Sequence, residues 1–200
     1  MPPVKSRREM YSDATRAALL EQATALFAER GFAATSLEDV AAATQVTRGA
    51  VYHHFANKMA LFEAVLDEQE TRAMGEIASA AAGISDPLEA ATKALGVFLD
   101  QCCEPVYGRL CWQEAPTALG FARWHEYEQK YAFGLVEGFI EALMSAGYLP
   151  RQAQETTTQF FFWMLGGAGM ALSRTEPEDR RRVRDEWYEL MIRSLSGLRP

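Results

Sequence analysis

Two adjacent histidines, His53 and His54, are the residues of this chain whose types most readily suggest chemistry. They lie in the stretch VTRGAVYHHF, residues 46–55, together with Arg48 and Tyr52. Imidazole nitrogens ligate metals and act as general bases, whereas arginine, tyrosine and histidine on a surface can bind phosphates and base edges. Helical geometry and the neighbouring sequence distinguish between these roles.

A short helix is predicted from Thr47, whose side chain can accept a hydrogen bond from its first turn. At about 100° per residue, Val51 and Phe55 form the buried side of this helix, and His53 points almost directly away from them. Neighbouring helical residues do not share a face, and no acidic or cysteine partner follows at i+3 or i+4. No metal site is therefore predicted at the two histidines.

The exposed face of this helix combines hydrogen-bond donors with small residues: Arg48, Gly49, Ala50, Tyr52 and His53. Small side chains permit close approach and fit against a thymine methyl, while arginine and histidine donate to guanine acceptors. This combination is typical of a recognition helix in the DNA major groove. A solvated helix face is the alternative, and the preceding segments favour DNA.

Two preceding segments complete a helix-turn-helix. A first helix is predicted to end at Gly31, which suits a left-handed cap, on the helical spacing of Leu19, Ala23, Leu26 and Phe27. A second, short helix starts with the capping-box pair Thr35 and Glu38 and ends near Thr44. A tight turn then leads to the helix from Thr47, so two short capped helices follow each other closely.

Residues 24–62, TALFAERGFAATSLEDVAAATQVTRGAVYHHFANKMALF, resemble the N-terminal DNA-binding region of the TetR family of bacterial transcriptional regulators, with an AcrR-like helix-turn-helix. The shared pattern, F…RGF…TSL.DVA…VTRG..Y.HF..K..L, involves many positions at fixed spacing. It covers roughly the first third of the chain. A second stretch, EAPTALGFARWHEYEQKY, resembles a C-terminal domain from one branch of the same family.

The resemblance implies a role for individual residues of this region. Thr35 and Ser36 would bind phosphate, and Lys58, after the predicted cap Asn57, would add a backbone N–H and a charge to another phosphate. The positions that would face bases are Arg48, Gly49, Ala50 and His53. Those that would meet the DNA backbone or the groove edge are Thr47, Tyr52 and His54.

The distribution of charge is compatible with a DNA partner, although the net charge is −7. Residues 1–60 carry seven basic and six acidic side chains, hence +1, and the remainder carries −8. One end of the chain can therefore approach a polyanion while the rest stays acidic. Within the resemblance, Arg7 and Arg8 are expected to form a mobile arm that adds affinity.

The predicted fold is all-α, because helix signals run through the chain without alternating strand patterns. A three-helix helix-turn-helix domain is expected at residues 1–60. A larger helical bundle follows at residues 61–200, which makes about nine helices in all. The fourth helix is expected to reach about Ala82 and to join the two parts.

Three further helices are predicted from caps and breaks in the second part. Asp86 as cap and Pro87 at the first position begin a helix that reaches Cys103. A broken helix follows around residues 106–114, and a long one runs from 120 to 146.

The resemblance implies that residues 61–200 bind a small effector and form a homodimer. The candidate pocket residues are large aromatics with two polar neighbours: Phe98, Trp112, Trp124, Tyr127, Phe161, Trp163, Gln113 and Glu114. Apolar pockets with few polar groups suit a planar, largely apolar effector. The alternative is that most of these aromatics are core residues. His125 is expected to be a surface or hydrogen-bonded histidine, because no catalytic motif accompanies it.

The last two helices are predicted to form the dimer interface. Glycines in an apolar helix lower its stability, a cost that close helix contact can offset. The candidate interface residues are Gly166, Gly167, Gly169, Val183, Trp187, Leu190, Met191 and Ser194. Twofold symmetry would place two recognition helices about one DNA turn apart on a palindrome.

The chain is expected to be cytoplasmic, without membrane contact. No apolar run follows the charged N-terminus, and the longest apolar block, residues 160–172, is shorter than the roughly 20 residues that cross a bilayer. The three cysteines have no metal-type spacing and are expected to be reduced thiols.

The predicted function is an effector-responsive repressor that binds a double-stranded DNA operator as a dimer. Effector binding would move the fourth helix and change the separation of the two recognition helices, so that operator affinity falls, a population shift that the resemblance implies. A thiol or soft-metal sensor of the same architecture, using Cys102, Cys103 and Cys111, is one alternative. A helical carrier or enzyme is another, but no phosphate loop, nucleophile motif or metal spacing supports catalysis, and no cofactor is expected.

Overall fold

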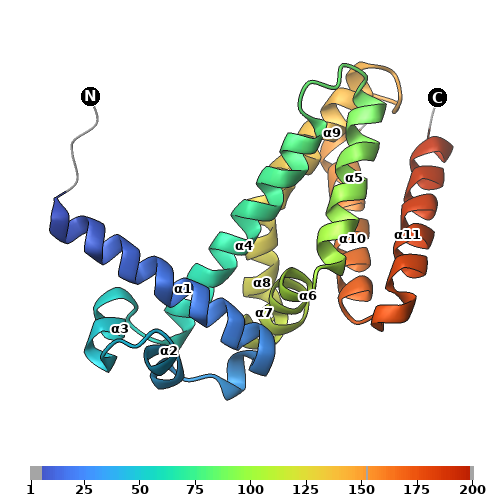
Figure 1. Cartoon of the computed structure of the whole chain (residues 1–200). Coiled ribbons are helices and arrows are strands. Elements are labelled where there is room, and N and C mark those ends of the chain that lie inside the picture. Colours follow the sequence, from blue (N-terminus) through green and yellow to red (C-terminus); the bar gives the residue numbers. More distant parts are fainter. Residues whose placement is uncertain (1–5, 152, 199–200) are drawn as a thin grey trace. The chain divides into compact units, whose positions relative to one another are not determined.

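The computed structural model describes residues 6–151 and 153–198, except for the side chain of Arg8. All regular elements in these ranges are helices (Figure 1), so the all-α prediction is confirmed. Two of the interruptions are π-helical turns that continue the helix, and the described elements therefore join into nine continuous helices. Among them, none is long and apolar enough to cross a membrane.

The chain divides into two compact units between Glu68 and Gln69, inside α4 (Lys58–Ala81). The first unit contains α1 (Arg7–Ala34), α2 (Leu37–Ala43), α3 (Arg48–His54) and the beginning of α4. Apolar side chains from all four helices are buried in it, among them Phe27, Val40, Val51 and Phe62.

The start of α1 differs from the sequence prediction. Ser6 caps this helix, because its hydroxyl accepts a hydrogen bond from the Glu9 N–H and the Glu9 carboxylate accepts one from the Ser6 N–H. Such a capping box satisfies two backbone donors that would otherwise lack partners. Arg7 and Arg8 consequently lie in the first helical turn, and the prediction that they form a mobile arm was wrong.

The end of α1 turns sharply at Gly31, as the sequence predicted. Gly31 has a φ of 83°, a left-handed value that glycine adopts without steric cost. Beyond this kink the backbone is helical again to Ala34, and the Phe32 ring packs 4.9 Å from the ring of Phe62.

The second unit contains five continuous helices after the remainder of α4. They comprise α5 (Pro87–Cys103), a bent helix made of α6 (Pro105–Arg109), η1 (Leu110–Glu114) and α7 (Ala115–Leu119), a long helix made of α8 (Phe121–Glu128), η2 (Gln129–Phe133) and α9 (Gly134–Ser145), then α10 (Gln154–Ser173) and α11 (Pro177–Gly197). The predicted cap Asp86 accepts hydrogen bonds from the N–H groups of Leu88 and Glu89 and is confirmed.

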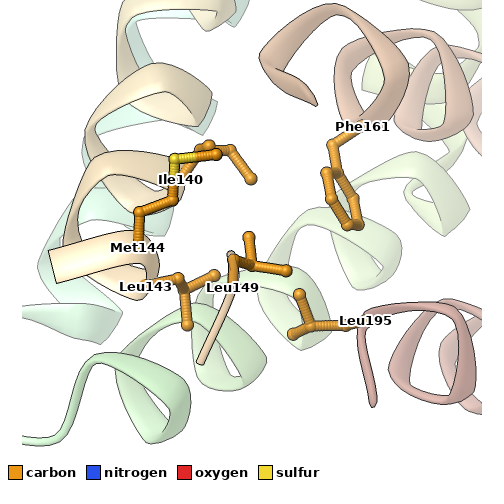
Figure 2. Packing of buried hydrophobic residues seen from close by; sticks show 6 residues of the cluster. All are labelled: Ile140, Leu143, Met144, Leu149, Phe161 and Leu195. Carbon is orange, nitrogen blue, oxygen red and sulfur yellow. The ribbon is translucent and has the colours of Figure 1, made fainter. Parts of the chain in front are cut away.

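One cluster of buried side chains ties the last three long helices together (Figure 2). It consists of Ile140, Leu143 and Met144 of α9, Leu149 after that helix, Phe161 of α10 and Leu195 of α11. Leu88 and Ala91 of α5 pack against it from the side. These contacts hold together α9, α10 and α11, which also line a cavity in the second unit.

Candidate functional site

The helix-turn-helix is held by backbone hydrogen bonds across a tight turn. Gln45 has a φ of 58°, and the N–H of Val46 donates to the Ala41 carbonyl over 3.0 Å. The Thr47 hydroxyl then accepts from the Ala50 N–H at 3.2 Å, which confirms Thr47 as the cap of α3. The start of α3 is thus determined by local hydrogen bonds.

The two faces of α3 differ in burial as predicted. Val51 is fully buried and Phe55, just after the helix, is 4% exposed. On the other side the exposed residues are Arg48, Gly49, Tyr52 and His53, with Ala50 half-buried among them. The candidate base-facing residues therefore form one accessible surface, which we call the α3 face.

Arg48 on the α3 face has protein partners. Its Nε lies 2.8 Å from Oε1 of Glu38 on α2, and its Nη2 donates to the Tyr52 hydroxyl over 3.2 Å. All three side chains are exposed, so water screens the ion pair and its contribution is small. These partners orient the guanidinium. Because they hold it weakly, a stronger acceptor such as a guanine edge can replace them.

The two histidines point in different directions around α3. Their ring centroids are 5.2 Å apart at an interplanar angle of 73°. Burial lowers the pKa of His54, with smaller contributions from His53 and Arg16, and so favours its neutral form. Among the described residues no group of three His, Cys, Asp or Glu side chains could hold a metal ion.

The predicted phosphate contacts need correction at Thr35. Its side chain is buried, and its hydroxyl donates to the carbonyls of Gly31, at 2.9 Å, and Leu26, at 3.3 Å. The capping box of α2 is formed one residue later, by Ser36 and Asp39, and this contact lowers the pKa of Asp39. The hydroxyl of Thr35 is therefore a structural group rather than a surface donor.

Lys58 lies at the start of α4, after Asn57. The Asn57 side chain accepts a hydrogen bond from the Ala60 N–H over 2.8 Å, which confirms it as the cap. The Lys58 ammonium donates to the Phe32 carbonyl at 2.8 Å and lies 4.4 Å from the centre of the Phe32 ring. Beside it is a shallow hollow lined by residues 33–38, Tyr52, Asn57 and Lys58, which is large enough to admit a phosphate group.

The second unit encloses a mainly apolar cavity with an empty volume of about 1090 Å³, part of which opens to solvent. Side chains of α4, α5, η1, the long helix, α10 and α11 line it. Five of the predicted ligand-binding aromatics belong to this wall: Phe98, Trp112, Trp124, Phe161 and Trp163.

Aromatic rings contact one another along the wall. The Trp112 ring is edge-on to Phe98 and to Trp124, at centroid distances of 6.1 and 5.8 Å. His125 stacks on Trp163 at 4.5 Å and 16°. His125 therefore belongs to the cavity wall, a position that the sequence did not indicate.

A polar cluster lies at one part of the wall. Glu128 lines the cavity and is 6% exposed, and Glu70 of α4, which is 1% exposed, interacts with it electrostatically. The Tyr107 hydroxyl donates to Oε2 of Glu70 over 3.2 Å. Burial raises the pKa of both carboxyls, in the case of Glu70 to about 7. Sequence reasoning missed both residues, because an isolated glutamate in a helix usually faces water.

The other predicted pocket residues do not line this cavity. The Gln113 amide donates to the Ser173 carbonyl, and the Glu114 carboxylate lies 3.8 Å from Nε of Arg109. The Tyr127 ring lies next to Tyr131, at a centroid distance of 5.4 Å. The prediction that Gln113, Glu114 and Tyr127 line the ligand pocket is therefore not met by this cavity.

The cysteines show no feature of reactive thiols. Cys102 and Cys111 are buried, Cys103 is half-buried, and none forms a disulfide. Burial raises the pKa of all three thiols, which disfavours the thiolate that oxidation and metal binding require. The geometry does not favour a cysteine-based sensor.

Two predicted interface residues belong to the interior of the chain. A Cβ at Gly169 would lie 2.5 Å from Cε2 of Trp112, so this glycine allows α10 to approach the indole. Met191 is buried, and it lines the cavity together with Gly166. Leu190 is 56% exposed, whereas Val183 and Trp187 are half-buried. The assignment of Gly169 and Met191 to a dimer interface is therefore corrected.

The first unit contains a helix-turn-helix whose second helix is accessible, and a larger helical unit follows it in the chain. This organisation places the fold in the class of helix-turn-helix regulators. Residues 19–65 match the family model of bacterial regulatory proteins of the tetR family. Residues 88–198 match that of the tetracyclin repressor-like C-terminal domain. The chain belongs to the TetR family, as the sequence resemblance suggested.

Several relatives of the chain are transcriptional regulators. An HTH-type transcriptional repressor of Mycobacterium tuberculosis is 47% identical over 72 residues, which is 35% of this chain and 38% of that protein. The regulator TtgR of Pseudomonas putida is 41% identical over 90 residues, 44% of this chain and 43% of that protein. The chain thus matches less than half the length of these relatives.

The fold similarity extends over almost the whole chain. A crystal structure of a TetR-family transcriptional regulator from Pectobacterium atrosepticum superposes with a TM-score of 0.81, at 25% sequence identity. The match covers 98% of both chains. The arrangement of the helices in the second unit is therefore shared with that TetR-family regulator.

Proposed function

We propose that the protein is a transcriptional repressor that binds a palindromic DNA operator as a homodimer and leaves it when a small molecule occupies the cavity. In this proposal residues 1–60 bind DNA, and residues 61–200 bind the effector and form the dimer. A bacterial DNA-binding regulator of this kind works in the cytoplasm. Neither catalysis nor a cofactor has a part in it.

The accessible α3 face is the observation that carries the proposal. It presents Arg48, Tyr52 and His53 on a helix whose opposite side is buried, next to the phosphate-sized hollow at Lys58. We assign base contacts to Arg48, Gly49, Ala50 and His53, and backbone or groove-edge contacts to Ser36, Thr47, Tyr52, His54 and Lys58. The backbone N–H groups at the start of α2 and α4 supply further phosphate donors.

The cavity supports an effector of small-molecule size. Its wall is mainly apolar and aromatic, as is usual for ligand sites. The helix α4 links the two functions in sequence, because it begins at Lys58 and contributes Met74 and Ile77 to the cavity wall. A ligand that favours one position of α4 over another shifts the population of DNA-competent dimers.

Dimerisation is assigned to α10 and α11. Leu190 is exposed on α11, and Trp187 is half-buried near Gly167, whose added Cβ would lie 4.0 Å from the indole. An exposed leucine beside a partly covered tryptophan provides apolar surface for a second copy of the same helices.

The test is a selection of bound sequences from a random duplex library by the purified full chain, at a stated salt concentration. We expect a palindrome whose half-sites lie about one helical turn apart or somewhat more. The Lys93→Ala variant, changed on the exposed side of α5, should select the same palindrome. Failure of a folded, dimeric protein to enrich any sequence would refute the proposal.

A further inference from the structure

We propose that the effector is a cationic amphiphile, with an aromatic-sized apolar body and one amine or quaternary ammonium group that binds at Glu128. This inference deepens the proposed function and rests on it for the regulatory meaning of the ligand. The binding site itself depends only on the second unit.

Among the described residues, the cavity wall contains one acid, Glu128, and neither lysine nor arginine. Glu128 and His125 are the titratable side chains among the residues that line it, and no lysine or arginine is included. A carboxyl group in an apolar wall is costly unless something compensates its charge. Apolar packing alone gives no reason for a glutamate at this position.

Among the described neighbours of Glu128, the Trp124 side chain gives it a neutral hydrogen bond, and no lysine or arginine compensates its charge. The titratable groups that act on it or on its partner Glu70 are Cys102, Tyr107 and Cys111, and none of them is a cation. The second carboxyl, Glu70, increases the need for positive charge, since like charges close together disfavour ionisation. Oε1 of Glu70 also has no hydrogen-bond partner.

The tryptophans beside Glu128 suit a positively charged group. Trp112 and Trp124 line the cavity with their rings in edge-to-face contact, 5.8 Å apart between centroids. A cation near an indole face gains electrostatic attraction, most strongly where water is excluded. Trp112 is itself 2% exposed, and its indole N–H has no acceptor, which leaves a donor for an oxygen atom on the ligand.

When a cationic ligand binds, its positive charge takes the place of the proton on the Glu128 carboxyl. The ion pair that results has no net charge. Burial raises the pKa of the Glu128 carboxyl in the empty cavity and so favours its protonated form. When the cation binds, the carboxyl loses its proton to solvent and the resulting carboxylate pairs with the ligand. Ligand binding and proton release are therefore linked.

The test compares three probes of similar shape on the full chain: phenethyltrimethylammonium, its neutral carbon isostere (3,3-dimethylbutyl)benzene, and 4-phenylbutyrate. Binding is followed by tryptophan fluorescence. The cation should bind at least about tenfold more tightly than either other probe, as expected for a desolvated cation beside a carboxylate and an indole face. Glu128→Gln should abolish this preference. Glu141→Gln, an exposed position on the same continuous helix, should keep it.

Calorimetry of the unmodified protein in two buffers of different ionisation enthalpy provides a readout that needs no variant. Protons should be released when the cation binds, since the cation lowers the carboxyl pKa that burial has raised. If Glu128→Gln does not fold, Glu128→Leu takes its place in the comparison.

Equal affinity for the three probes, no measurable binding of the cation, or binding without proton release would each overturn the inference. So would a cation preference that survives the removal of the carboxyl. None of these measurements involves DNA. Failure of operator selection together with a Glu128-dependent cation preference would refute the proposed function and leave the cation site in place.

Discussion

Polar side chains play opposite roles in the two units. Around the α3 face they are exposed or half-buried, and their internal partners are easily exchanged: Arg48 pairs with Glu38, and Lys58 with the carbonyl of Phe32. At the cavity, Glu70 and Glu128 are buried together, and within the described part of the chain neither forms an ion pair with a basic side chain. The first arrangement suits a polyanion that brings its own acceptors, and the second suits a ligand that brings positive charge.

The largest expected effect comes from the buried acids. The pKa of Glu70 is raised from 4.5 to about 7, so the folded chain retains a proton that the unfolded chain loses. The free energy of unfolding therefore decreases as pH rises from about 4.5 to about 7, and then levels off. Glu70→Gln should remove this loss and stabilise the protein by up to about 3 kcal/mol at pH 8, with no gain at pH 4.

Urea unfolding at several pH values checks this difference, with Glu68→Gln, an exposed position on the same helix, as control. A Glu70→Gln variant that is equally stabilised at all pH values would show that the buried carboxyl is not the titrating group.

A second prediction concerns the close packing around the cavity. Gly169→Ala places a Cβ 2.5 Å from the Trp112 ring, so α10 or the indole must shift. We expect a loss of about 1 to 3 kcal/mol in the free energy of unfolding and a changed tryptophan emission, as overpacking predicts. Gly138→Ala has no heavy atom within 4 Å of its new Cβ and should leave stability unchanged or higher. Equal melting temperatures for the two variants would contradict the assigned packing.

On the α3 face the effect should be on base preference. Arg48→Ala should lower affinity by about 1 to 3 kcal/mol for the selected operator but much less for duplexes already altered at the base that Arg48 contacts. Tyr52→Ala should weaken all sequences alike. Affinities for single-base operator variants at one salt concentration separate the two cases. A uniform loss for Arg48→Ala would remove it from the base-reading residues.

The smallest effect is expected at Glu38. Glu38→Ala frees the Arg48 guanidinium from its exposed partner and should raise DNA affinity by less than about 1 kcal/mol, since surface ion pairs contribute little. The gain should shrink as salt increases. A decrease in affinity would mean that Glu38 positions Arg48 for DNA rather than competing with it.

The helix-turn-helix was predictable because its signals are local. The cap at Thr47, the buried Val51 and the exposed Arg48 follow from helical spacing within a few residues. The capping box of α2 was misplaced by one residue, because Thr35 and Ser36 both have hydroxyls and only the bonds of Thr35 to Gly31 and Leu26 distinguish them.

The cavity was predictable only in its aromatic content. Five of the aromatic residues that the sequence indicated line the wall. Glu128 was missed, although it shares helical spacing with Trp124, Ala132 and Leu135 and Glu126 does not. Both glutamates belong to one charged stretch, and in the structure Glu126 is exposed and Glu128 buried.

The sequence by itself determined the class of fold, the helix-turn-helix and the orientation of α3, because these depend on hydrogen bonds and periodicity over a few residues. Only the tertiary structure decided that Gly169 admits Trp112 and that Glu70 and Glu128 share one buried site. The physical reason is the long-range origin of burial: the environment of a side chain is set by helices that are distant in sequence, and burial decides whether a carboxyl is a solvated surface group or a ligand contact.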